Sequence, residues 1–249
     1  TYAEEVSLNR TPVKEQTICS VDLGINTDAV CTIMRPDGTI LGRKFINFPS
    51  DKDRMYRVLG RIRRFQREHG SRQVQGRWAY AKRLNTELGK KIAREIVFYA
   101  SENRADVIVF EYLEMKGKLS GKKKQKLQMW RKRDIQKRCG QQAHRKGIRI
   151  SRICAWNTSR LAFDGSGKID RDIQDHRLCT FQNGKRYNCD LSASYNIGAR
   201  YFIREILKPL PATERSLLEA KVPAVKRRTS CVYADLRDLI SEMELRKAA

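Results

Sequence analysis

Three acidic residues stand in sequence contexts that favour chemistry over a solvated surface. Asp22 lies inside the apolar, β-branched run TICSVDLGIN, Glu111 follows the apolar run VIVF, and Asp190 opens the stretch CDLSASYNIGARYF. Carboxylates brought close together raise one another's pKa, and burial adds a desolvation cost. Divalent cations remove this cost, and ligand sets made only of oxygen suit Mg²⁺ or Mn²⁺.

Such a set of carboxylates predicts phosphodiester hydrolysis. Two metal ions about 3.5–4 Å apart would activate a water and stabilise the leaving oxygen, so no Ser, Cys or His nucleophile is needed. Each acid also has a purely structural interpretation. Asp22 could be hydrogen-bonded into a turn, Glu111 could mark the point where a strand reaches solvent, and Asp190 could be a helix N-cap. The catalytic interpretation therefore depends on a fold that brings all three together.

The hydrophobic periodicity and turn signals divide the chain into strands, helices and a polar insert. We expect strands over residues 17–25, 29–35, 39–47, 106–113 and 148–156. Helical patterns cover residues 55–65, 78–96, about 125–145 and 190–206. The segment Pro36-Asp37-Gly38 predicts a tight turn, so the second and third strands should form an antiparallel hairpin with the first strand alongside.

The resulting order, β-β-β-α-β-α-β-insert-α, predicts an α/β fold with a mixed sheet flanked by helices. It matches the RNase H-like fold, in which the first and fourth strands are central neighbours and the last helix crosses them. The acids would then converge. We divide the chain into a nuclease core (residues 1–156), an insert (157–188), a last core helix (189–206) and a tail without an assigned role (207–249).

Composition predicts a polyanionic partner. The 249 residues include 52 Lys and Arg against 28 Asp and Glu, a net charge of +24, and the basic residues are clustered along the whole chain. This excess rules against an ordinary metabolic enzyme and favours nucleic acid as the partner. The sequence contains no apolar run of membrane-spanning length and no signal-peptide pattern, and its seven cysteines are scattered, so we expect an intracellular protein without a disulfide framework.

The motifs VDLGIN, VIVFEYLEMKG and CDLSASYNIGAR resemble the three RuvC motifs of TnpB, the transposon-encoded RNA-guided nuclease, and of the type V CRISPR effectors. The resemblance covers roughly residues 17–204 and implies that Asp22, Glu111 and Asp190 are the metal-binding catalytic acids. It also implies Mg²⁺ or Mn²⁺ as cofactor, a guide RNA and a target DNA as partners, and a prokaryotic cytoplasmic setting. Because the family's N-terminal recognition part has no counterpart before Thr17, we expect the chain to be a segment of a longer protein.

The insert departs from this family, whose members often carry a zinc ribbon there. Ala162 and Gly165 stand at the first pair of expected cysteine positions, and the second pair is Cys179 and Gln182. Four tetrahedral ligands are lacking, so we predict no structural zinc. A remnant site made of His176, Cys179 and Cys189 is the less favoured alternative.

We expect the insert to guide single-stranded DNA to the acids. The candidate phosphate contacts are Arg160 and Arg177, with Arg131 and Arg133 on the preceding basic helix. The candidate stacking groups, half of which should instead belong to the core, are Trp156, Phe163, Phe181 and Tyr187. A further expectation is that Gly24 leaves room beside Asp22 for a metal ion or a substrate backbone.

Two other functions remain open. One is a nucleic-acid-binding module that keeps a RuvC-like fold without cleaving. The other is an unguided junction resolvase, although that class predicts a compact chain without the basic helices and the insert. The motifs do not separate TnpB from a type V effector.

Overall fold

The computed structural model describes residues 5–70, 74–112, 131–227 and 229–248 of the chain. Its central element is a five-stranded sheet with the order β3-β2-β1-β4-β5, and a second sheet has the order β6-β7-β8. The strands are β1 (Ile18–Asp22), β2 (Ala29–Met34), β3 (Ile40–Ile46), β4 (Val107–Tyr112), β5 (Arg149–Cys154), β6 (Asp170–Arg171), β7 (Leu178–Thr180) and β8 (Arg186–Asn188). The α-helices are α1 (Pro49–His69), α2 (Gln75–Glu102), α4 (Lys132–His144), α5 (Cys189–Leu207), α6 (Ala212–Lys221) and α7 (Tyr233–Ala248). Two short 3₁₀ helices are η1 (Val13–Glu15) and η2 (Pro223–Lys226).

The large sheet is mixed, as the order of elements predicts. Strand β2 runs antiparallel to both β1 and β3, whereas β1, β4 and β5 run parallel to one another. The expected hairpin of β2 and β3 is confirmed, and so is the central pairing of β1 with β4. In that pairing Val21 lies opposite Phe110, which makes Asp22 and Glu111 the next residues along two neighbouring strands.

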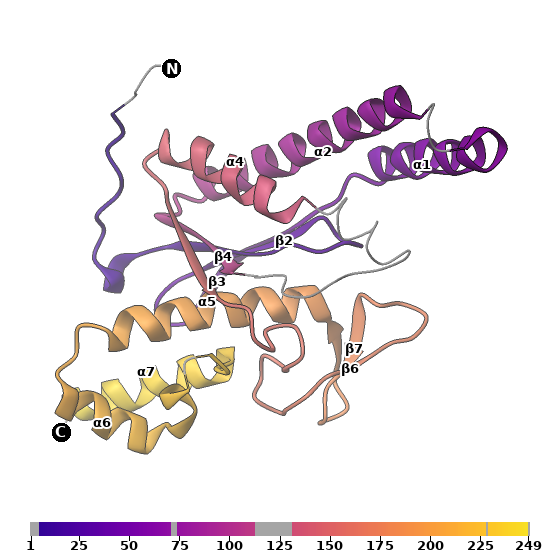
Figure 1. The fold of residues 1–249 in the computed structure, drawn as a ribbon. Helices are drawn as coiled ribbons and strands as arrows, with labels where there is room; N and C mark the ends of the chain where they lie inside the picture. The colour runs from indigo at the N-terminus through magenta and orange to yellow at the C-terminus, as the bar shows by residue number, and fades with distance from the viewer. Residues whose placement is uncertain (1–4, 71–73, 113–130, 228, 249) are drawn as a thin grey trace.

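Helices cover both faces of the sheet (Figure 1). Helices α2 and α4 pack together over one face, where α1 and α2 form a hairpin that extends past the sheet edge. On the opposite face α5 contacts β1, β2, β4 and β5, and α7 packs on the outer side of α5. The sheet is thus buried on both sides, which explains why its central strands are continuous apolar runs.

Side-chain alternation directs the acids toward α5. On β1, Cys19 and Val21 pack in the core under α2 and α4, so Ser20 and Asp22 point to the opposite face. On β4, Phe110 packs in that same core, so Glu111 also faces α5. The neighbouring strands β1 and β4 therefore direct the two carboxylates to the same face of the sheet.

Helix α5 is buried almost all round, because it lies between the sheet and the C-terminal helices. Its approach to the sheet requires Gly198, where an added Cβ would lie 2.8 Å from Met34 Cε and 3.2 Å from Ser20 Oγ. The N-cap of α5 is Asn188, whose side chain accepts a hydrogen bond from the Leu191 N–H at 2.9 Å. Asp190 is therefore not the N-cap that its sequence position allowed.

The insert holds more regular structure than its sequence indicates. Residues 157–188 show little periodicity, yet they contain the three short strands of the second sheet. The tail forms two α-helices, and Tyr233 of α7 donates a hydrogen bond to the Gly38 carbonyl at 2.6 Å. The part of the basic helix expected at 125–130 lies outside the described residues, and α4 begins at Lys132. Of the helices described, none combines the length and apolar character needed to cross a bilayer.

Candidate active site

Asp22 and Glu111 lie at the carboxyl ends of β1 and β4, at the centre of the large sheet. Both are buried, with exposed fractions of 7% and 6%. No hydrogen bond or ion pair joins the Asp22 carboxylate to another residue in the described part of the chain. Glu111, by contrast, is held by hydrogen bonds from α4 and from the loop after β5. The rigid strands fix both backbones, which suits residues that must hold a ligand precisely.

Asp190 joins them from the first turn of α5 and is partly buried. Burial raises the pKa of Asp190, against the opposing effects of Arg171, of a hydrogen bond from the Thr27 side chain, and of Arg177. Thr27 belongs to the loop between β1 and β2, so this contact ties the start of α5 to the strand that carries Asp22. A carboxylate in the first helical turn is also favoured by the helix dipole.

The three acids act on one another electrostatically. Burial raises the pKa of Asp22 well above its usual value, and the negative charges of Glu111 and Asp190 raise it further. Lys132 and Arg171 act in the opposite direction and do not offset the rise. The sequence predicts that these acids converge, and the coupling of Asp22 to both of the others agrees with that prediction.

Among the described residues, three side chains hydrogen-bond to Glu111. Lys132 Nζ lies 3.2 Å from Glu111 Oε2, and the Thr158 hydroxyl donates to Oε1. Gln136, one turn further along α4, donates its side-chain amide to the Glu111 backbone carbonyl at 3.0 Å. The side chain and the backbone of Glu111 are therefore fixed by α4 on one side and by the loop after β5 on the other.

A buried polar network from α5 holds that loop. Asn196 Nδ2 donates to the Thr158 carbonyl at 3.0 Å, and Arg200 donates to the carbonyls of Cys154 and Trp156 at 2.9 and 2.7 Å. Burial lowers the pKa of Arg200. Because Arg200 is only 2% exposed, these bonds are shielded from water, and they fix the position of Thr158 beside Glu111.

The donor set fits a hard divalent cation in its chemistry. The three groups are carboxylates on rigid elements, and Asp22 in particular has no hydrogen-bond or ion-pair partner among the described residues. In the described residues, however, no group of three or more His, Cys, Asp and Glu side chains has the spacing of a formed metal site. Asp22, Glu111 and Asp190 would be the residues to hold Mg²⁺ or Mn²⁺, and their catalytic and metal-binding roles stay predictions.

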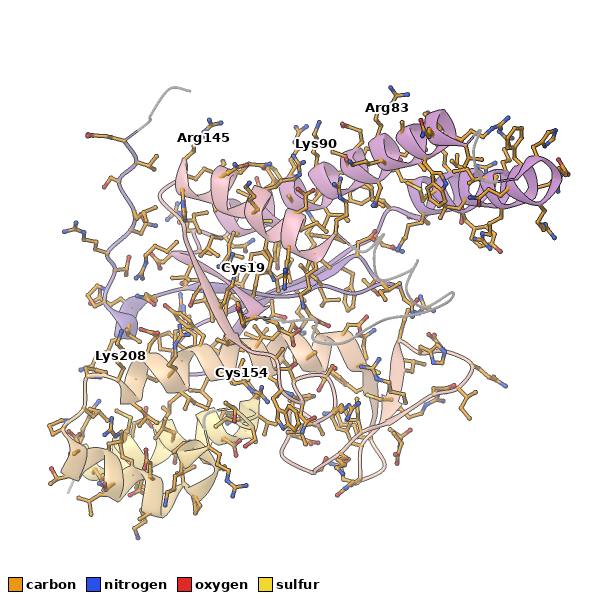
Figure 2. The ribbon with its side chains drawn as sticks, in the orientation of Figure 1. Cys19, Arg83, Lys90, Arg145, Cys154 and Lys208 are labelled. Atoms are coloured by element: carbon orange, nitrogen blue, oxygen red, sulfur yellow. The ribbon has the colours of Figure 1, made fainter. Side chains whose placement is uncertain are left out.

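The candidate phosphate contacts lie in different environments. Arg131 caps α4 and donates to the Thr86 hydroxyl, so it has a structural contact, whereas Arg133 is exposed. Arg160 is exposed in the insert. Arg177 pairs with Asp175 at 2.8 Å and is close enough to Asp190 to influence its pKa. Basic residues also cover the outer side of the helical layer, where Arg83, Lys90 and Arg145 point away from the sheet (Figure 2).

The insert packs around a small apolar core. Ala162, Cys179, Phe181 and Cys189 are buried together, with Phe163 and Tyr187 against them. Three of the four candidate stacking aromatics therefore belong to this core, which is more than the half that the sequence suggests. Trp156, by contrast, is 67% exposed. The absence of a structural zinc stays a prediction.

The expectation for Gly24 is wrong. An added Cβ there would lie 2.5 Å from the Thr27 carbonyl oxygen, so the space is filled by the loop itself and not left for a metal or a substrate. The glycine allows the chain to turn sharply after β1 and to bring Thr27 to Asp190.

Sequence reasoning missed Lys132, Thr158 and Arg171. Lys132 stands between Arg131 and Arg133 in a basic run, and only the helical phase of α4 distinguishes it. Thr158 lies in the polar segment at the start of the insert, and nothing in the sequence distinguishes it there from an ordinary loop threonine. Arg171 lies on β6, a strand of two residues with no sequence signature.

Comparison with known proteins shows a shared fold. The structure is similar to a Cas12f1 chain solved as a complex with sgRNA and target DNA, with a TM-score of 0.58, 19% sequence identity, and coverage of 73% of this chain and 49% of that chain. It is also similar to a CRISPR-Cas12f chain from a ternary complex, with a TM-score of 0.52, 16% identity, and coverage of 79% and 40%. A scan of family models and a search of curated proteins give no match.

These likenesses confirm, at the level of the fold, the resemblance to type V effectors that the three motifs indicate. At such low identity they do not transfer individual residues or activities. The chain spans about half or less of the length of these Cas12f chains.

Proposed function

We propose that the chain is the RuvC-type nuclease part of an RNA-guided DNA endonuclease. The strand order β3-β2-β1-β4-β5, with β2 antiparallel to its neighbours and α5 across the central strands, supports an RNase H-like fold. The three motif acids occur on the elements where such a fold would use them.

The observation that carries the proposal is the buried carboxylate of Asp22, which has no hydrogen-bond or ion-pair partner among the described residues and lies near two further acids. Repulsion and desolvation make this arrangement costly for the protein alone, and a divalent cation would relieve both. Such an arrangement is expected where function and not stability has set the residues.

In the proposed mechanism Mg²⁺ or Mn²⁺, when bound, supplies water activation and stabilisation of the leaving oxygen. Asp22 and Glu111 hold their carboxylates on neighbouring rigid strands, and Asp190 adds a third from α5. Thr158 orients Glu111 through its hydroxyl. The burial of Asp22 and Glu111 limits their contact with bulk water, which strengthens electrostatic interactions at the two carboxylates.

Guide RNA and target DNA are the proposed partners. The net charge of +24 and the basic outer surface of α2 and α4 support binding to polyanions, and the Cas12f1 chain of similar fold was solved with both kinds of nucleic acid. The proposed setting is the cytoplasm of a prokaryote. TnpB and a type V effector are both compatible with the chain.

A binding module without cleavage is the second candidate. It is favoured by one observation, the engagement of both Glu111 carboxylate oxygens by Thr158 and Lys132. In such a module these contacts would be a permanent structural arrangement.

The deciding experiment is to purify the protein with its bound RNA, sequence that RNA, and assay cleavage of a matching DNA in Mg²⁺ or in EDTA. We expect cleavage only with Mg²⁺, a loss of at least about 100-fold in Asp22→Ala, and no change in Asp53→Ala, which alters an exposed acid on α1. An Asp22→Ala variant that cut as fast as the parent would refute the catalytic assignment. Bound RNA without any cleavage would favour the binding module.

A further inference from the structure

Lys132 places a positive charge inside the acidic centre. The residue is 8% exposed, and its ammonium lies 3.2 Å from Glu111 Oε2. Burying a charged side chain is costly unless it is paired, and the Glu111 carboxylate supplies such a partner. The first turn of α4 delivers it to the carboxyl end of β4, where Glu111 lies.

The surroundings leave little freedom in this pair. Thr158 holds the second carboxylate oxygen of Glu111, and Gln136 holds its backbone carbonyl. Gln136 also accepts a hydrogen bond from Arg152 Nε at 3.2 Å, which connects α4 to β5. Lys132 and Glu111 are therefore fixed relative to each other by contacts on both sides.

The charge of Lys132 extends beyond its direct partner. It lowers the pKa of Asp22, as Arg171 does from the insert, although burial and the two other acids outweigh them. Within the described residues, Lys132, Arg171 and Arg177 thus already place positive charge near the three acids. A divalent cation entering the same site would be repelled by the ammonium and would share Glu111 with it.

We propose that Lys132 is a built-in counter-ion of Glu111, which stabilises the acidic centre in the absence of a divalent cation and competes with that cation for the site. This inference rests on the metal-dependent function proposed above. Lys132 is a positioning residue in this scheme, because it acts through Glu111 and not on the substrate.

The test compares Lys132→Met with Lys137→Met in the full chain. Lys137 lies on the same helix but is exposed, so the two variants lose the same charge and gain the same side chain. Thermal unfolding is followed in EDTA and across a Mg²⁺ titration without nucleic acid. In EDTA, Lys132→Met should melt below both the parent and Lys137→Met. The Mg²⁺ concentration that gives half of the thermal shift should fall about tenfold, within the range of typical coupling between sites.

Two further variants separate charge from packing. Lys132→Gln retains an N–H donor without the charge and should show the same lowered Mg²⁺ requirement. This variant replaces Lys132→Met in the test if the Met variant does not fold. Lys132→Arg retains the charge and should keep the parental requirement.

An unchanged or raised Mg²⁺ requirement in both uncharged variants, while the parent responds to Mg²⁺, would overturn the role of Lys132 alone. If Mg²⁺ shifted the melting of neither the parent nor any variant, the metal site itself would be wrong, and the counter-ion role would fall with it. The two failures are therefore distinguishable.

Discussion

Neutralising Asp22 should stabilise the protein when no divalent cation is present. The Asp22 carboxylate is buried, has no hydrogen-bonding partner in the described residues, and faces Glu111 and Asp190. A buried charge without a partner costs several kcal/mol, whereas the Asn amide leaves the smaller cost of an unsatisfied polar group, about 1–3 kcal/mol. Asp22→Asn removes the charge with little change in volume. A gain of about 2 kcal/mol corresponds to a rise in Tm of about 4–8 °C for a chain of this size.

The gain should depend on pH in a defined direction. Burial and like charges raise the pKa of Asp22 in the folded state, so folding favours its protonated form. The contribution of Asp22 to stability is fully present below the usual Asp pKa of about 3.9 and is lost as the pH rises through its raised folded pKa. The advantage of Asp22→Asn should therefore be small in acid and largest at neutral pH.

The assay is thermal unfolding of both proteins in EDTA and in excess Mg²⁺. In Mg²⁺ the parent should recover stability and the variant should gain little, because it has lost a ligand. Asp28→Asn is the matched control. Asp28 is equally buried, at 6%, but it accepts from the Phe48 N–H at 2.8 Å and pairs with Lys52 at 3.3 Å, so its neutralisation should destabilise. A variant Asp22→Asn that melted below the parent in EDTA at neutral pH would refute the reasoning.

Three other predictions address nucleic-acid binding and packing. Trp156→Ala should weaken binding of single-stranded DNA about 5- to 150-fold in a fluorescence anisotropy titration, because base stacking on an aromatic side chain contributes about 1–3 kcal/mol. The control is Phe181→Leu in the buried insert core, which should change stability more than affinity. Binding should also weaken steeply as salt rises, and a flat logarithmic salt dependence would contradict an extended phosphate-binding surface. Gly198→Ala should destabilise the chain by about 1–3 kcal/mol in urea denaturation, since its Cβ would meet Met34 and Ser20, and wild-type stability would show that α5 can shift away from the sheet.

The interior of the site was largely predictable because its signals are local. A carboxylate inside an apolar run stands out in Asp22 and Glu111, and the alternation of side chains along a strand fixes the face on which each lies. The pairing of β1 with β4 follows from the order of strands and crossover helices. The resemblance of the three motifs to RuvC motifs points to the same three acids.

The partners of those acids were decided only by the tertiary structure. Lys132 differs from Arg131 and Arg133 through the phase of α4, and that phase matters because α4 packs against the sheet at one particular angle and depth. Thr158 reaches Glu111 because Asn196, on a helix 38 residues further along the chain, holds its backbone.

The sequence thus determined that Asp22 and Glu111 bring negative charge into the core, since burial and side-chain alternation are properties of each strand. It did not determine what compensates that charge, because compensation depends on contacts between elements far apart in the chain. Gly24 shows the same limit. A side chain at this position would collide with the carbonyl oxygen of Thr27, and only the folded conformation of the loop brings that carbonyl close.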